Sequence, residues 1–274
     1  MNRKNILNNW RELPRSGGRP TIAYRTDGDG EPLVLVHGVG GDGGNWDGVV
    51  AALPPHFRTI RIDLSGHGRS GLLTAPCSVQ DLARDVTDVM DALGVRAAAI
   101  AGFSLGGLIA QCIALDSPAR VTRLALIATV AGRTPEEQAR SVARIEVVRE
   151  KGLAAIAAGN REFWFSDGFR AEHPEVVDAR VRQFMACDPV SYLHAFAVFA
   201  KGDFVDRLQE IRAPSLVLAG EFDPAATAHM AGLMHERIAG SRVEILAGMR
   251  HALLIECPGR VAALMAEFLR ATPA

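Results

Sequence analysis

The sequence predicts an α/β fold in which helices cover both faces of a mostly parallel sheet. Six short runs are almost continuously apolar rather than alternating, which is typical of strands buried on both faces. Longer segments with helical spacing of apolar residues separate several of these runs, as in right-handed βαβ units. The predicted strands are 32–38, 58–64, 97–103, 123–129, 214–220 and 242–248.

Four segments between or after these strands are predicted to be helices. The clearest is 78–93, where Leu82, Val86 and Val89 recur at helical spacing. The others are 105–115, 226–240 and 259–271.

The alternation stops between residues 132 and 210, where glycines and prolines separate several amphipathic helical stretches. We therefore expect a polar N-terminal arm at 1–19 and an α/β core built from 20–131 and 211–274. The segment 132–210 is expected to form an inserted helical cap.

Composition narrows the class of partner. The net charge of −1 gives no basic surplus for nucleic acid or an anionic membrane surface. No apolar run has the roughly 18 residues of a membrane span, and the N-terminus lacks the apolar stretch of a signal peptide. We expect a cytoplasmic protein. Its cysteines lie far apart without metal-ligand spacing, which predicts free thiols and no metal site: Cys77, Cys112, Cys187 and Cys257.

A serine between glycines is the first chemical signal. In GFSLG (102–106), Ser104 follows a predicted strand and opens a predicted helix. A serine on such a turn projects its hydroxyl above the sheet, and the N–H of Leu105 favours developing negative charge. The alternative is that Ser104 merely caps the helix, although a cap does not require glycine on both sides.

A serine nucleophile needs a general base and an acid that orients it. Asp223 follows the strand 214–220, with Glu221 as a weaker rival, and His251 follows the strand 242–248. Each comes just after a strand and in the order serine, acid, histidine. Asp223 alone could be an ordinary turn aspartate before Pro224.

A glycine-rich loop, HGVGG (37–41), follows the strand 32–38. Such a loop can place a backbone N–H beside the nucleophile. We predict that the N–H groups of Val39 and Leu105 form an oxyanion hole.

Taken with DLSGHGRS (63–70), GEFDP (220–224) and RHALLIECP (250–258), these motifs give a resemblance to the α/β-hydrolase superfamily over residues 20–274. Within it, the chain resembles 3-oxoadipate enol-lactonases and related small-molecule esterases. The resemblance implies a cap between the sixth and seventh core strands, a small-molecule substrate, and no metal or organic cofactor. It implies a serine hydrolase of a carboxylic ester or lactone. Whether the chain forms a homo-oligomer stays open.

The substrate contacts are harder to predict. Arg133 is a candidate for binding a substrate carboxylate, although an arginine at this position more often faces solvent or pairs with a neighbour such as Glu136. Trp164 is a candidate for lining the pocket, or for packing the cap on the core. The cap carries 11 basic and 13 acidic residues, so its total charge does not indicate an anionic substrate.

Three other functions fit the same motifs. A C–C bond hydrolase would use the same triad, but the apolar neighbours Phe103 and Leu105 favour an ester or lactone. A cofactor-free perhydrolase or oxygenase and a ligand receptor without turnover are the remaining alternatives.

Overall fold

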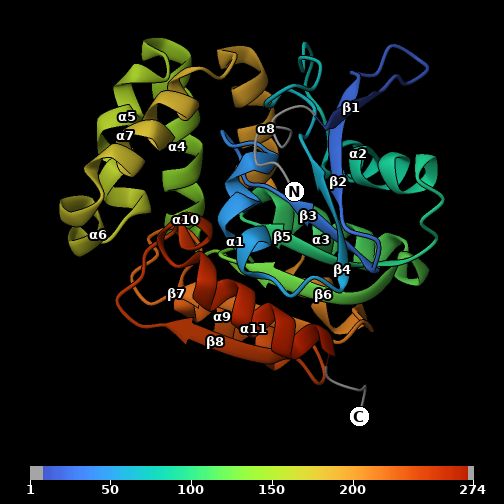
Figure 1. Ribbon diagram of the computed structural model, residues 1–274. Helices are drawn as coiled ribbons and strands as arrows, with labels where there is room; N and C mark the ends of the chain where they lie inside the picture. Colours follow the sequence, from blue (N-terminus) through green and yellow to red (C-terminus); the bar gives the residue numbers. More distant parts are fainter. Residues whose placement is uncertain (1–8, 271–274) are drawn as a thin grey trace.

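The computed structural model describes residues 9–270, which form one eight-stranded sheet with the order β1-β2-β4-β3-β5-β6-β7-β8 (Figure 1). The strands from β3 to β8 pair in parallel, while β1 and β2 are antiparallel to their neighbours. Their bounds are β1 Trp10–Leu13, β2 Ile22–Asp27, β3 Glu31–Val36, β4 Phe57–Ile62, β5 Ala98–Phe103, β6 Val121–Ile127, β7 Ser215–Gly220 and β8 Arg242–Leu246.

The six predicted strands correspond to β3 through β8, and the mostly parallel sheet is confirmed. All of β7 and nearly all of β5 are buried, because helices cover both faces of the sheet there. The edge strand β8 is only partly buried, and its sequence alternates charged with apolar residues.

Helices cover the sheet in two groups on opposite faces (Figure 1). Helix α1 packs on α11, while α2 packs on α3. The core helices are α1 Asp47–Ala52, α2 Val79–Ala92, α3 Leu105–Asp116, α9 Ala228–Arg237, α10 Leu253–Glu256 and α11 Pro258–Arg270. Short 3-10 helices are η2 Gly43–Trp46, η3 Pro118–Arg120 and η4 Val205–Glu210.

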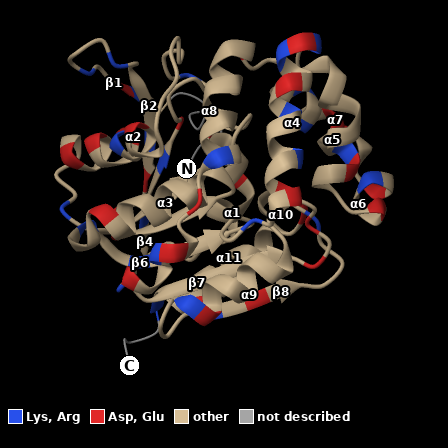
Figure 2. Cartoon of the chain, turned by 180° about the vertical axis from the view of Figure 1, so that it is seen from behind, with Lys and Arg blue, Asp and Glu red and all other residues tan. Residues whose placement is uncertain are grey.

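Five helices inserted between β6 and β7 stack together at one end of the sheet (Figure 1). They are α4 Pro135–Lys151, α5 Ala154–Trp164, α6 Asp167–Glu172, α7 Pro174–Met185 and α8 Pro189–Lys201. We call them the cap. The 3-10 helix η4 also falls within 132–210 but packs against α3 and α9 of the core. Acidic and basic residues are interspersed on the cap helices (Figure 2).

The base of the cap is tied together where the chain enters and leaves it. The Asp203 carboxylate accepts hydrogen bonds from the N–H groups of Gly132 (2.9 Å) and Arg133 (3.2 Å). Arg133 in turn donates from Nη1 to the Gly202 carbonyl (2.9 Å) and from Nη2 to the Phe199 carbonyl (2.7 Å). Arg133 therefore joins the two ends of the insertion.

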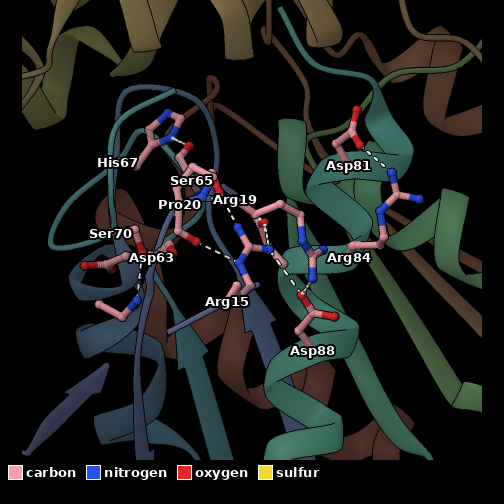
Figure 3. Close-up of polar contacts among 12 residues, drawn as sticks. Arg15, Arg19, Pro20, Asp63, Ser65, His67, Ser70, Asp81, Arg84 and Asp88 are labelled. Atoms are coloured by element: carbon pink, nitrogen blue, oxygen red, sulfur yellow. Dashed lines mark hydrogen bonds and ion pairs between the residues drawn. The ribbon is translucent and has the colours of Figure 1, made fainter. Parts of the chain in front are cut away.

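The N-terminal segment differs from the expected polar arm, of which residues 1–8 lie outside the described part. Residues 10–13 form edge strand β1, and Arg15 reaches under the loop that follows β4. Its Nη1 lies 2.6 Å from an Asp85 oxygen, and both side chains are almost fully buried. Arg15 and Arg19 also converge on Asp88 of α2 (Figure 3). These ion pairs fix a segment whose polar sequence resembles that of a tail.

No helix within residues 9–270 has the length and apolar character required to cross a bilayer.

Candidate active site

Ser104 occupies a strained turn between β5 and α3. Its φ of 54° lies in the left-handed region, which costs a non-glycine residue on the order of 1–3 kcal/mol. Two hydrogen bonds hold the turn: the Ser104 N–H donates to the Ile127 carbonyl (2.9 Å), and the Thr129 hydroxyl donates to the Ser104 carbonyl (2.7 Å). The Ser104 side chain does not cap α3. A helix-capping role for this serine is thus excluded.

The glycines around Ser104 permit close backbone contacts. A Cβ on Gly102 would lie 2.1 Å from the Gly106 carbonyl oxygen, and one on Gly106 would lie 2.2 Å from the Val36 carbonyl oxygen. Any side chain at these positions would push α3 away from β3 and β5. The two glycines therefore let the helix begin directly against the sheet, which places the serine side chain at the end of β5 rather than within the helix.

The structure brings Ser104, His251 and Asp223 together in a triad-like arrangement. Nε2 of His251 lies 3.2 Å from Oγ of Ser104, and Nδ1 lies 2.7 Å from Oδ2 of Asp223. The other Asp223 oxygen accepts hydrogen bonds from the N–H groups of Ala225 (2.8 Å) and Ala226 (3.0 Å). All three triad side chains are buried. The carboxylate is thus held rigidly, with one oxygen directed at the imidazole.

Glu221, the rival acid, points elsewhere. It is exposed, and its Oε2 accepts a hydrogen bond from the N–H of Gly248 (2.8 Å). It therefore supports the loop that follows β8, while Asp223 is the acid beside the imidazole.

The glycine-rich loop 37–41 lies directly against the nucleophile's turn. A Cβ on Gly38 would approach the Cβ of Ser104 to 3.0 Å. His37 anchors the loop: its Nδ1 lies 2.8 Å from the Gly38 carbonyl oxygen, and its Nε2 accepts the N–H of Leu64 (3.0 Å). Burial lowers the pKa of His37 to about 4, so its ring is neutral at pH 7.

The two predicted oxyanion donors lie on this loop and on the helix that starts after Ser104. Within residues 9–270, neither the Val39 nor the Leu105 N–H has an acceptor in the protein. Both amides are therefore available to an oxygen atom of a bound molecule.

Ser104 and His251 open into a cavity of about 320 Å³ between the core and the cap, a size that suits a small molecule. Both residues predicted as substrate contacts, Arg133 and Trp164, line it. Trp164 also holds the histidine loop, because its carbonyl accepts the N–H of Ala252 (2.8 Å). Arg133 lines the cavity while its Nη atoms bond to backbone carbonyls at the base of the cap.

Sequence reasoning missed several residues of the cavity wall. Aromatic rings make up much of the cap side, and Arg144 and Arg180 lie among them. No motif marks these positions, because helix packing within the cap decides which side chains face the cavity. The aromatic residues of the wall are Phe103, Phe163, Trp164, Phe184, Tyr192, Phe196 and Phe199.

Within the part of the chain that the structure describes, no group of three or more His, Cys, Asp or Glu side chains could hold a metal ion.

Comparison with known proteins places this chain in a family. Residues 31–197 match the family model described as alpha/beta hydrolase fold. The chain is 30% identical to an (E)-2-((N-methylformamido)methylene)succinate hydrolase of Acinetobacter baylyi, over 92% of this chain and 95% of the relative. It is 31% identical to 3-oxoadipate enol-lactonase 2 of the same species, over 82% and 84% of the two chains. A hydrolase from Pseudomonas aeruginosa superposes with a TM-score of 0.90 at 33% identity, covering 97% of this chain and all of the other.

Proposed function

Since the chain belongs to the alpha/beta hydrolase fold family, we propose that it hydrolyses a carboxylic ester or lactone of a small molecule through an acyl-enzyme. The observation that carries the proposal is the continuous contact from Asp223 through His251 to Ser104, at a cavity large enough for a small substrate. Similarity to an enol-lactonase supports the ester or lactone bond.

In the first step, Oγ of Ser104 attacks the scissile carbonyl carbon while Nε2 of His251 takes its proton. Asp223 keeps Nδ1 protonated and stabilises the imidazolium. The carbonyl oxygen becomes an oxyanion, which accepts hydrogen bonds from the N–H groups of Val39 and Leu105. The C–O bond then breaks and the imidazolium protonates the departing alkoxide, which leaves an acyl group on Ser104.

In the second step, His251 takes a proton from a water molecule that attacks the acyl carbon. The second oxyanion collapses, the serine oxygen leaves, and it regains the proton from His251. The acid product then dissociates. For a lactone, the alcohol and the acid are parts of one product molecule.

The test combines turnover and covalent labelling. Wild-type protein should hydrolyse short 4-nitrophenyl esters or simple lactones and should react with a fluorophosphonate probe. Ser104→Ala should lose both, with kcat lower by up to about 10⁶-fold. Full hydrolysis by Ser104→Ala would refute the proposal. A panel extended to diketones and amides separates ester hydrolysis from C–C or amide bond cleavage, and no turnover on any member favours a receptor.

A further inference from the structure

Arg144, on cap helix α4, lies in the cavity wall between two aromatic rings. Its guanidinium carbon lies 5.6 Å from the ring centre of Phe163 and 5.6 Å from that of Phe196. Nη2 donates a hydrogen bond to the side-chain oxygen of Asn160 (2.7 Å), and the Tyr192 hydroxyl interacts with the same guanidinium. Among residues 9–270, no carboxylate pairs with Arg144.

The other arginines of the cavity have different positions or partners. Arg133 donates from both Nη atoms to backbone carbonyls at the base of the cap. Arg180 donates from Nη1 to the Gly40 carbonyl (2.8 Å). Arg140 also lines the cavity, but its side chain is exposed. Arg144 differs from each of them. It is partly buried, unlike Arg140, and its hydrogen bond goes to the side chain of Asn160 rather than to the backbone, unlike those of Arg133 and Arg180.

The charge balance of the wall is strongly positive, unlike that of the cap as a whole. The ionisable carboxylate in the wall is Glu137, against arginines 133, 140, 144 and 180. Glu137 is already engaged, since its Oε2 accepts the N–H of Thr134 (2.8 Å) at the start of α4. Arg144 is partly buried among aromatic rings, where an ion pair with an entering anion would be screened by water less than one at the surface.

We propose that Arg144 binds a carboxylate group of the substrate, so that the enzyme selects small esters or lactones that carry an acidic group away from the scissile bond. The inference rests on the proposed function, because it concerns the acyl or alcohol portion of the molecule that Ser104 attacks. The planar guanidinium matches two carboxylate oxygens at once. The flanking rings hold that plane in place and exclude water, which strengthens the ion pair.

The experiment compares two esters with the same leaving group and acyl chains of equal length. Mono-4-nitrophenyl glutarate carries a terminal carboxylate, and 4-nitrophenyl pentanoate ends in a methyl group. Wild type should prefer the glutarate ester by about 10–100-fold in kcat/KM. Arg144→Met should lower kcat/KM for the glutarate ester by about 100-fold, mainly through KM, and should remove most of the preference. Arg144→Lys should restore part of it.

The matched control is Arg140→Met, one helical turn earlier on α4 and exposed at the same wall. It should keep the preference for the glutarate ester. A binding readout independent of turnover is calorimetry of free glutarate with the Ser104→Ala protein. Binding should be measurable there and absent from the Ser104→Ala, Arg144→Met double variant.

Each outcome separates this inference from the proposed function. Faster hydrolysis of the pentanoate ester by wild type would leave the proposed function standing and overturn the carboxylate site. An equal loss for both esters in Arg144→Met would show that Arg144 only holds the cap together. A similar loss of preference in Arg140→Met would assign the selectivity to the general field of the cavity mouth. Failure of wild type to hydrolyse or be labelled at all would refute the proposed function itself.

Discussion

The core and the cap line the same cavity but contribute different chemical groups. The core supplies Ser104, Asp223 and His251 from turns that follow strands, and each is fixed by hydrogen bonds to nearby backbone. The cap supplies aromatic rings and arginines from helix faces. The positions of the first group depend on sheet geometry, and those of the second depend on how helices pack. We infer that the core determines the reaction and the cap determines the substrate.

The largest expected effect after loss of the nucleophile tests the core. Asp223→Asn should lower kcat on the order of 10³–10⁴-fold for every substrate, because the amide no longer holds His251 in the tautomer that accepts the serine proton. KM should change little, since Asp223 does not contact the substrate portion of the cavity. Steady-state kinetics on both 4-nitrophenyl esters measures this.

The matched control for that prediction is Glu221→Gln, two residues earlier and exposed. It should leave kcat within about threefold, because its carboxylate only accepts the Gly248 N–H. A large and substrate-dependent loss in Asp223→Asn, or an equal loss in Glu221→Gln, would break the division between core and cap.

Arg180 belongs to the cap but contacts a loop of the core. It comes from cap helix α7, stacks over the ring of Trp164 at 4.2 Å, and donates to the Gly40 carbonyl of the predicted oxyanion loop. Burial lowers the pKa of Arg180 to about 10, so it is still charged at pH 7. We expect it to be a positioning residue that fixes the shape of the loop 37–41.

Arg180→Met should therefore lower kcat by about 10–100-fold, less than the complete loss of an oxyanion donor, while KM for a neutral ester changes little. Arg180→Lys should recover part of kcat by donating to the same carbonyl. The control is Gln183→Ala on the same helix, which loses only the hydrogen bond from Asn45 (3.0 Å). A change in KM alone would instead indicate that Arg180 contacts the substrate. Arg180 would then have the role that we infer for the rest of the cap.

The contrast between the two regions also explains what could be predicted from the sequence. The parallel strands and the positions of Ser104, Asp223 and His251 follow from buried apolar runs and from residues placed just after them. Strands β1 and β2 were not predicted, because β1 has only four residues, two of them charged, and the apolar part of β2 is limited to its first half. The ion pair of Arg15 with Asp85 of α2 holds the segment between these two strands in place.

The arginines in and beside the cap could be assigned a role from the sequence even less well. Nothing in the sequence distinguishes the role of Arg133 from that of Arg144. The total charge of residues 132–210 is nearly balanced as well, so it does not mark either residue. Only the packing of α4 against α5 and α8 directs Arg144 between two rings, while Arg133 bonds to carbonyls at the base. When a helix packs against the protein on one side and lines a cavity on another, the spacing of its apolar residues does not show which side chains face the cavity.

The smallest expected effect is on stability, and it concerns a buried histidine of the core. His67 is buried beside His37, and the charges of Asp63 and Asp42 act on it. Its Nδ1 lies 3.1 Å from the Ser65 carbonyl oxygen, and its Nε2 has no partner among the described residues. Burial, with a smaller contribution from His37, lowers the pKa of His67 to about 3, against about 6.5 in an unfolded chain. Between these values the unfolded state binds the extra proton, so His67 lowers the free energy of unfolding as the pH falls below about 6.5.

The slope from one such histidine is at most about 1.4 kcal/mol per pH unit. His67→Leu should therefore lose stability less steeply than wild type between pH 6 and pH 4.5, as measured by urea unfolding at several pH values. Only the difference between the two proteins is diagnostic, because burial raises the pKa of Asp63 and Asp85 and these groups act with the opposite sign. His56→Leu, at an exposed histidine, is the control. If the free energy of unfolding changes with pH in the same way for wild type and His67→Leu, the prediction is wrong. The His67 ring would then take up its proton as readily in the folded protein as in the unfolded chain.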